Sequence, residues 1–218
     1  MHISACLFDL DGVIVDTAKY HYLAWRRLAN SLGFDFSEAQ NEQLKGVSRM
    51  QSLRIILEMG GLQRSESELD KLAAQKNEWY LAYVDEMTPD EILPGVVSFL
   101  EDLQQSGIRI GLGSASKNAR RILDHIGLTH FFDTIIDGNQ TTRGKPDPQV
   151  FLLGAQALGV DPNHCVVFED APKGVEAALA GGFYAIGIGS ADHLGHAHLV
   201  IPGFEDIDHQ VFAQLPPQ

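Results

Sequence analysis

The sequence predicts an α/β protein in which a largely parallel sheet is interrupted by an all-helical insertion. Short runs rich in apolar and β-branched residues alternate with segments of helical spacing along most of the chain. This alternation is typical of parallel strands joined by crossover helices. The stretch 17–88 breaks the pattern, because it has helical periodicity throughout and no strand-like run. We therefore expect a core domain, residues 1–16 and 89–218, and a helical cap domain, residues 17–88.

The sequence also predicts where the strands and helices of the core domain lie and which of its loops carry functional residues. Helix-breaking signals between Thr88 and Gly95 mark the return from the insertion. Ligands of such sheets bind beyond the carboxyl ends of the strands, so functional residues are expected in the loops after them. Strands are expected at 3–7, 108–112, 134–136, 165–168 and 184–188, and helices at 96–105, 119–126, 150–158 and 175–180.

Length and charge limit the function classes. A chain of 218 residues can hold one domain of about 150 residues plus an insertion. The 16 Lys and Arg against 29 Asp and Glu leave a net charge of −13, which argues against an extended surface for nucleic acid or an anionic membrane. A small phosphorylated ligand needs only a few local cations or a metal ion and is compatible with this charge.

The sequence does not indicate a membrane-spanning or disulfide-stabilised protein. No apolar run reaches about 18 residues, and no basic segment precedes the first strand-like run. The two cysteines, Cys6 and Cys165, lie in apolar runs and are expected to be buried thiols rather than a disulfide or zinc ligands. We expect a cytoplasmic monomer.

An Asp-x-Asp-Gly motif, Asp9 to Gly12, ends the first predicted strand. Alternate residues of a strand point to the same side, so Asp9 and Asp11 are expected to face one side together. Two clustered carboxylates without a cation repel each other, which suits a hard cation such as Mg²⁺ or a nucleophile with an acid/base partner. The alternative is a solvated Asp-Gly turn.

Polar groups also follow three later strands. Ser114 opens the segment 114–118, whose hydroxyls, lysine and free N–H groups could cradle a phosphate or form only an ordinary helix start. Lys145 precedes another helix and is unremarkable by itself. Glu169 and Asp170 could complete an oxygen-only metal site, or lie in a solvated loop. Because each group ends a strand, all of them are expected to converge on one crevice.

With these residues in this order, the chain resembles the haloacid dehalogenase superfamily, in its subgroup with a helical cap. The resemblance implies a Rossmann-like core, with Asp9 as the nucleophile that forms an aspartyl-phosphate and Asp11 as the general acid/base. The groups that it implies for Mg²⁺ are the Asp9 carboxylate, the Asp11 backbone carbonyl and Asp170, with Glu169 in or near the shell. The residues that it implies around the transferring phosphoryl group are Ser114 and Lys145.

Two predicted cap helices carry polar residues on otherwise apolar faces. Thr17, His21 and Trp25 share one helical stripe, and Lys76 lies in the middle of another. A cation on a packing face is costly unless it is paired or points into a wet cleft. The alternatives are a hydrogen-bonded core histidine for His21 and a stem that reaches solvent for Lys76.

A basic segment, Lys45 to Ser52, lies between cap helices. Its Arg49 guanidinium could bind a second phosphate. The alternative is that this segment is only an exposed, basic start of a helix. With this segment the cap resembles that of the β-phosphoglucomutases, which implies conversion of β-D-glucose 1-phosphate to D-glucose 6-phosphate through β-D-glucose 1,6-bisphosphate. The substrate-binding residues implied in this way are Thr17, His21, Trp25, Lys45, Gly46, Arg49, Ser52, Lys76, Ser114, Ala115, Ser116, Lys117, Asn118 and Lys145.

Two other interpretations stay open. A capped sugar-phosphate phosphatase would use the same Asp9, Asp11 and Mg²⁺, but the cap cations fit a substrate with two phosphates better. A non-catalytic binding protein is disfavoured because every expected catalytic position is filled. Val15 and the loop 138–144 depart from the pattern of the β-phosphoglucomutases, and the loop could alter how Lys145 is delivered.

Overall fold

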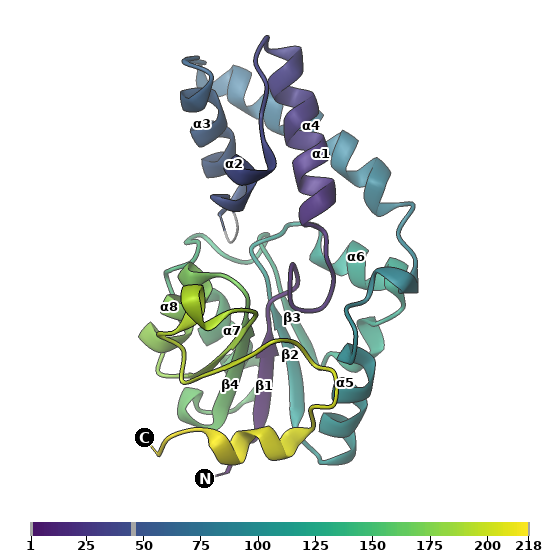
Figure 1. Cartoon of the computed structure of the whole chain (residues 1–218), viewed down its shortest axis with the longest axis vertical. Coiled ribbons are helices and arrows are strands. Elements are labelled where there is room, and N and C mark those ends of the chain that lie inside the picture. Colours follow the sequence, from purple (N-terminus) through teal and green to yellow (C-terminus); the bar gives the residue numbers. More distant parts are fainter. Residues whose placement is uncertain (1, 45–46, 218) are drawn as a thin grey trace.

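The computed structural model describes residues 2–44 and 47–217, and their strands form one parallel sheet in the order β3-β2-β1-β4-β5-β6. This is the order of a doubly wound Rossmann-like sheet. Successive strands are added on one side of β1 up to β3 and on its other side from β4 onward. The loop after β1 therefore opens onto the middle of the carboxyl edge (Figure 1). The strands are β1 (Ala5–Phe8), β2 (Arg109–Gly113), β3 (Thr134–Ile136), β4 (Cys165–Glu169), β5 (Tyr184–Ile188) and β6 (Leu199–Ile201).

Helices cover both faces of the sheet. The helices α5 (Val96–Gln105) and α6 (Ala119–Ile126) pack on the face that receives Phe8, whose ring stacks on Phe168 at 4.7 Å. The opposite face, which receives Leu7, is covered by α7 (Gln149–Leu158) and α8 (Pro172–Ala180). Successive residues of β1 thus enter different apolar cores, as the strand's alternation requires. The remaining short helices are α9 (Ala191–Leu194), η1 (Pro89–Glu91), η2 (Thr129–Phe131), η3 (Pro162–His164) and η4 (His209–Gln214).

Four helices inserted between β1 and α5 stand beyond the carboxyl edge of the sheet (Figure 1), and we call them the cap. They enclose an apolar cluster of their own, which includes Trp25, Leu53 and Leu69. Ala24, Tyr80 and Val84 of the same helices belong instead to the apolar cluster of the sheet, so the cap packs partly on itself and partly on the core. The cap helices are α1 (Ala18–Ser31), α2 (Glu38–Glu42), α3 (Arg49–Met59) and α4 (Glu66–Val84).

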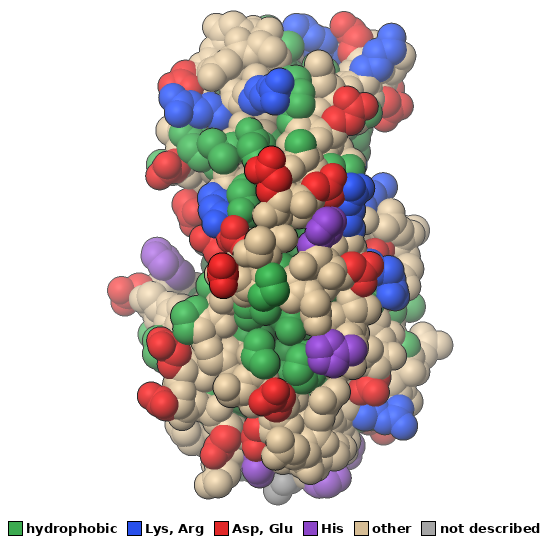
Figure 2. All heavy atoms as spheres, turned by 90° about the vertical axis from the view of Figure 1, so that its right-hand side faces the viewer, with side chains coloured by type: hydrophobic (Ala, Val, Ile, Leu, Met, Phe, Trp, Pro, Cys, Tyr) green, Lys and Arg blue, Asp and Glu red, His purple; other side chains and the backbone are tan. Residues whose placement is uncertain are grey.

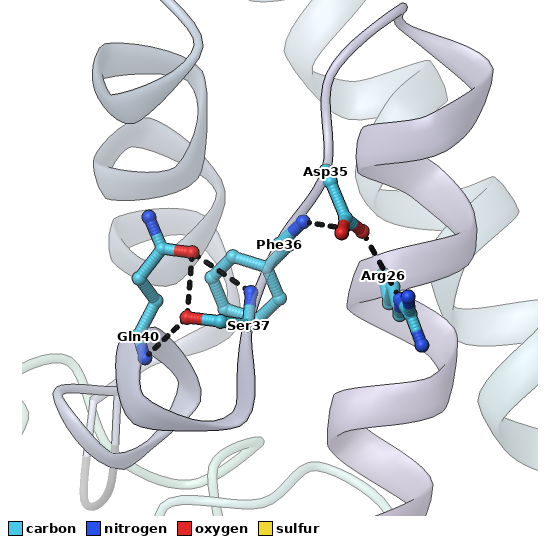
Figure 3. A network of polar contacts seen from close by, with 5 residues as sticks. All are labelled: Arg26, Asp35, Phe36, Ser37 and Gln40. Atoms are coloured by element: carbon cyan, nitrogen blue, oxygen red, sulfur yellow. Dashed lines mark hydrogen bonds and ion pairs between the residues drawn. The ribbon is translucent and has the colours of Figure 1, made fainter.

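A polar network fixes the turn between α1 and α2 (Figure 3). Asp35 Oδ1 accepts from Arg26 Nε at 3.1 Å and from Phe36 N at 2.9 Å, while the Phe36 ring is buried in the cap. Ser37 N donates to Gln40 Oε1 at 2.8 Å, and Gln40 N donates to Ser37 Oγ at 3.3 Å. This capping box starts α2 directly after the buried ring, so the cap's internal geometry is set locally.

The predicted fold class is confirmed. Helices α5 and α6 have the expected bounds, and the five expected strands differ by no more than two residues at either end. The three-residue strand β6 was not predicted, although its apolar run is as long as that of the predicted strand at 134–136. Cys6 and Cys165 are buried free thiols on opposite faces of the sheet, as expected.

The surface and the helices give two further observations. On the face shown in Figure 2, Lys and Arg side chains lie between Asp and Glu side chains and form no continuous basic area. None of the helices that the structure describes is long and apolar enough to cross a membrane.

Candidate active site

The loop after β1 turns sharply and brings its carboxyl groups against β4. Asp9 N continues the ladder by donating to Phe168 O at 3.0 Å. Gly12 has φ +83°, and a Cβ placed there would lie 2.2 Å from Asp170 Oδ2. Position 12 therefore requires glycine for two reasons: its backbone is left-handed, and Asp170 approaches it too closely for a Cβ.

Lys145 joins the loops that follow β1 and β4. Its Nζ donates to Asp9 Oδ1 at 2.6 Å and to Glu169 Oε2 at 2.7 Å, and all three side chains are buried. Burial lowers the pKa of Lys145, but the two carboxylates outweigh that effect and raise it above its ordinary value. The ammonium is therefore charged at neutral pH.

Glu169 lies beside this ammonium and near two further acidic side chains, Asp9 and Asp170. Burial raises the pKa of Glu169, Lys145 lowers it, and Asp9 and Asp170 raise it further. Asp9, Glu169 and Asp170 each offer one carboxylate oxygen, and these oxygens lie within 4.8 Å of one another. Carboxylate oxygens are the ligands that hard divalent cations prefer. The donor set therefore fits a divalent metal ion.

Asp11 is a second acid in this site whose pKa is strongly raised. Burial raises its pKa to about 8, with Asp9 and Asp170 adding to the increase. Its Oδ1 is buried and has no hydrogen-bond partner among the described residues. A carboxyl group that is protonated near neutral pH is suited to general acid catalysis. Its side chain is not part of the cluster of three acids, and the expected role of its backbone carbonyl is not tested by that cluster.

The predicted phosphate-binding loop follows β2 and is held by short-range hydrogen bonds. Ser116 N donates to Ser114 Oγ at 3.1 Å, and Asn118 N donates to Ser116 Oγ at 3.2 Å. Asn139, in the loop after β3, donates from Nδ2 to Lys117 O at 3.0 Å. These bonds hold the backbone atoms of Ser116, Lys117 and Asn118 where the loop meets the start of α6.

A cavity of about 540 Å³ lies between this edge of the sheet and the cap. Its walls include Asp9 and Lys145 from the core and Arg49 and Lys76 from the cap. Burial lowers the pKa of Arg49, a half-buried residue at the start of α3. The cavity thus receives positive charge from both parts of the protein.

Lys76 and His21, which were predicted on two different cap helices, contact each other within the cap. Lys76 is 1% exposed, and its Nζ lies 2.9 Å from His21 Nδ1 and 4.4 Å from the centre of the Trp25 ring. Burial lowers the pKa of Lys76 well below its ordinary value, and Arg49 adds to the decrease. Burial likewise lowers the pKa of His21, with Lys76 and Arg49 contributing. A neutral His21 can accept at Nδ1 from Lys76, which puts the His21 proton on Nε2.

The structure brings most of the predicted site residues to one cavity. Thr17, Ser114 and Glu169 are buried without lining it. Lys45 and Gly46 lie outside the described residues. The predicted residues that line the cavity are Asp9, Asp11, His21, Trp25, Arg49, Ser52, Lys76, Ala115, Ser116, Lys117, Asn118, Lys145 and Asp170.

Sequence reasoning missed several lining residues. Tyr80 was detectable, because it follows Lys76 by one helical turn, and it proves to be fully buried with a hydroxyl that has no partner among the described residues. Asn41 carries no comparable signal, since nothing local distinguishes it from a surface residue of α2. The other lining residues without an assigned role include Asp16, Asp70, Asn77, Thr141, Thr142 and Arg143.

Comparisons with known proteins agree with this geometry. Residues 3–182 match the model of the haloacid dehalogenase-like hydrolase family. The chain belongs to this family. Among the haloacid dehalogenase-like proteins, it is 39% identical over 207 residues to the β-phosphoglucomutase of Bacillus subtilis (strain 168), covering 94% of this chain and 92% of the relative.

Two further members of the family are similar. The crystal structure of β-phosphoglucomutase (pgmB) from Clostridium difficile superposes with a TM-score of 0.94 at 42% identity, covering 97% of this chain and 96% of that chain. The fructose-1-phosphate phosphatase YqaB of Escherichia coli (strain K12) is 34% identical over 185 residues, covering 84% of this chain and 94% of the relative. Both mutases and phosphatases therefore occur among the relatives.

Proposed function

We propose that this protein is a β-phosphoglucomutase, which converts β-D-glucose 1-phosphate to D-glucose 6-phosphate through β-D-glucose 1,6-bisphosphate. The observation that carries the proposal is the distribution of cations around one cavity: Lys145 lies beside Asp9, and Arg49 and Lys76 come from the cap. A substrate with a phosphate at each end matches positive charge at both ends. The similarity to two β-phosphoglucomutases supports the same activity.

In this proposal the Asp9 carboxylate carries the phosphoryl group. The C6 hydroxyl of glucose 1-phosphate attacks phospho-Asp9, the bond between Asp9 oxygen and phosphorus breaks, and Asp11 takes the hydroxyl proton. The bisphosphate then turns end for end. Asp9 attacks the phosphorus at C1, and Asp11 returns the proton to the departing sugar oxygen. The raised pKa of Asp11, about 8, suits a group that must take and give a proton near neutral pH.

The remaining core residues would hold the phosphoryl group and the metal ion during the transfer. Lys145 and Ser114 would hold the transferring phosphoryl group. We propose Mg²⁺ as the divalent ion, held by Asp9, Asp170 and the Asp11 backbone carbonyl, with Glu169 in or near the shell. When bound, it would offset the negative charge of the phosphoryl oxygens.

The cap, proposed as a domain of residues 17–88 on a core of residues 1–16 and 89–218, would close over the substrate. Arg49 would hold the phosphate that is not transferred, while the other predicted residues of the cap and of the loop 114–118 line the sugar site. Closure would exclude water from phospho-Asp9, whose hydrolysis would turn a mutase into a phosphatase. We also propose a cytoplasmic monomer that acts on small sugar phosphates without nucleic-acid or membrane partners.

Phosphorus NMR tests the activity directly. The purified protein is mixed with Mg²⁺, β-D-glucose 1-phosphate and a trace of the 1,6-bisphosphate. A growing glucose 6-phosphate signal with little inorganic phosphate is the expected result. Inorganic phosphate as the main product would favour the second candidate, a sugar-phosphate phosphatase, which the similarity to YqaB supports. The Asp9→Asn variant should fold normally and lose either activity, and turnover in it would contradict the assignment of Asp9.

A further inference from the structure

A hydrogen bond joins the cap directly to the predicted phosphate-binding loop. Asn118 Nδ2 donates to Asn77 Oδ1 at 2.9 Å, although the two residues are 41 positions apart. Asn77 lies on the cap helix α4, and Asn118 immediately precedes the core helix α6. Both residues line the cavity. The contact therefore crosses the cavity wall at the place where cap and core meet.

The Asn118 side chain makes this contact instead of a local one. An asparagine at a helix N-cap ordinarily accepts from the N–H of the second or third helical residue. Asn118 occupies the N-cap position of α6, but its side chain makes no capping hydrogen bond. Its amide points toward the cap, and its backbone, with φ −107° and ψ 7°, is not in the extended conformation of a capping residue. The start of α6 is therefore an alternative partner that this side chain would reach only after a change of its backbone conformation.

The rest of the loop is fastened to the core. Ser114 N donates to Ile136 O at 3.0 Å, Gly138 N donates to Ser116 O at 3.2 Å, and Asn139 holds the Lys117 carbonyl. None of these bonds involves the cap. Asn118, by contrast, is a member of the loop whose side chain is hydrogen-bonded to the cap.

A second polar contact joins the same two helices farther from the cavity. Arg121 donates to Asp85 from Nε at 2.9 Å and from Nη2 at 2.7 Å. Both side chains are more than 40% exposed, so solvent screens this ion pair. It can keep α4 alongside α6, but it touches no residue of the loop. The contact that bears on the loop is the one between Asn77 and Asn118.

We propose that Asn77 is a positioning residue that couples the placement of the cap to the conformation of the phosphate-binding loop. With the cap in place, Asn77 holds the Asn118 amide on the cavity wall. When the cap moves away, Asn118 rotates and caps α6. A phosphorylated sugar then meets the complete loop only under the cap. The consequence for turnover rests on the proposed mutase activity, whereas the rotation of Asn118 does not.

The rotation is tested by NMR on the full-length protein without substrate. In Asn77→Ala, the Asn118 side-chain amide signals should shift, and the backbone amide of Arg121, the third residue of α6, should shift as it gains a capping acceptor. Asn77→Asp keeps an acceptor and should stay close to the wild type. Asn30→Ala, at an exposed position on α1, is the matched control and should leave both signals unchanged. Equal shifts in Asn77→Ala and Asn77→Asp, or none in either, would overturn the proposal.

The kinetic consequence is tested with the same variants. Loss of one hydrogen bond that orders a binding group should raise the KM for the 1,6-bisphosphate about fivefold in Asn77→Ala. In an Asn118→Ala background, Asn77→Ala should not raise the KM further, because the side chain that Asn77 would hold is absent. Additive effects would contradict the coupling. A wild type that forms no glucose 6-phosphate would refute the proposed function instead, and the NMR result would still decide the role of Asn77.

Discussion

The Lys145 ammonium lies 2.6 Å from Asp9 Oδ1 and bridges it to a second buried carboxylate, that of Glu169. Replacing Lys145 by Met leaves these acids without their cation, and removal of one partner from a buried ion pair typically costs about 3–5 kcal/mol. We expect a loss of this size in the free energy of unfolding, measured with urea at pH 7. Lys71→Met, on the exposed side of α4, should change it by less than about 0.5 kcal/mol.

The pH dependence of this loss gives an independent check. Without Lys145, which lowers it, the pKa of Glu169 in the folded protein rises further above that of the unfolded chain. The folded state then binds more protons as the pH falls, so the stability deficit of the variant should shrink toward low pH. Saturating Mg²⁺ should also restore part of the stability. A deficit that grows toward low pH would show that the carboxylates are not its cause.

Much of this site could be predicted because its residues are placed by local rules. Asp9 and Asp11 are two apart at the end of a strand, and Ser114 follows another strand of the same sheet, so the fold class alone brings them together. The contact between Asn77 and Asn118 could not be predicted in this way. It depends on how two separately packed layers meet, and no periodicity within α4 or α6 records that arrangement.

Gly12 should be required for metal binding as well as for its backbone conformation. A Cβ there would lie 2.2 Å from Asp170 Oδ2, whereas a Cβ on Gly61, which also has a positive φ, would have no heavy atom within 4 Å. Gly12→Ala and Gly61→Ala should both destabilise the fold by about 1 kcal/mol or more through backbone strain. Calorimetric titration should show weaker Mg²⁺ binding in Gly12→Ala alone. Equal affinities in the two variants would mean that Asp170 adjusts without consequence.

His21 should make the protein less stable in mild acid. Burial and Lys76 lower the pKa of His21 in the folded state, whereas a histidine of the unfolded chain has a pKa of about 6.5. As the pH falls below about 6.5, His21 becomes protonated in the unfolded chain but stays neutral in the folded protein. The free energy of unfolding therefore decreases. The decrease can reach about 1.4 kcal/mol per pH unit. It should end once the pH passes the lowered pKa.

His21→Gln should remove this contribution while keeping an acceptor for Lys76. Urea unfolding about one pH unit either side of the unfolded pKa, from about pH 7.5 to about pH 5.5, should therefore show a flatter profile for His21→Gln than for the wild type. His193→Gln, at an exposed position, should follow the wild-type profile. Parallel profiles for His21→Gln and the wild type would show that His21 is protonated in the folded state.

Tyr80 should tolerate the loss of its hydroxyl better than Tyr20. Tyr80 is fully buried, and its hydroxyl makes no well-aligned hydrogen bond among the described residues, although the Thr17 side chain lies near it. The Tyr20 hydroxyl, by contrast, donates to Glu91 Oε1 at 2.5 Å. A buried, unsatisfied polar group costs about 1–3 kcal/mol, so Tyr80→Phe should leave the free energy of unfolding unchanged or raise it. Tyr20→Phe should lower it by about 1 kcal/mol, because it removes one of two donors to a charged acceptor, the other being Lys19. Thermal and urea unfolding of both variants at pH 7 provide the comparison, and a larger loss in Tyr80→Phe would mean that its hydroxyl is satisfied in solution.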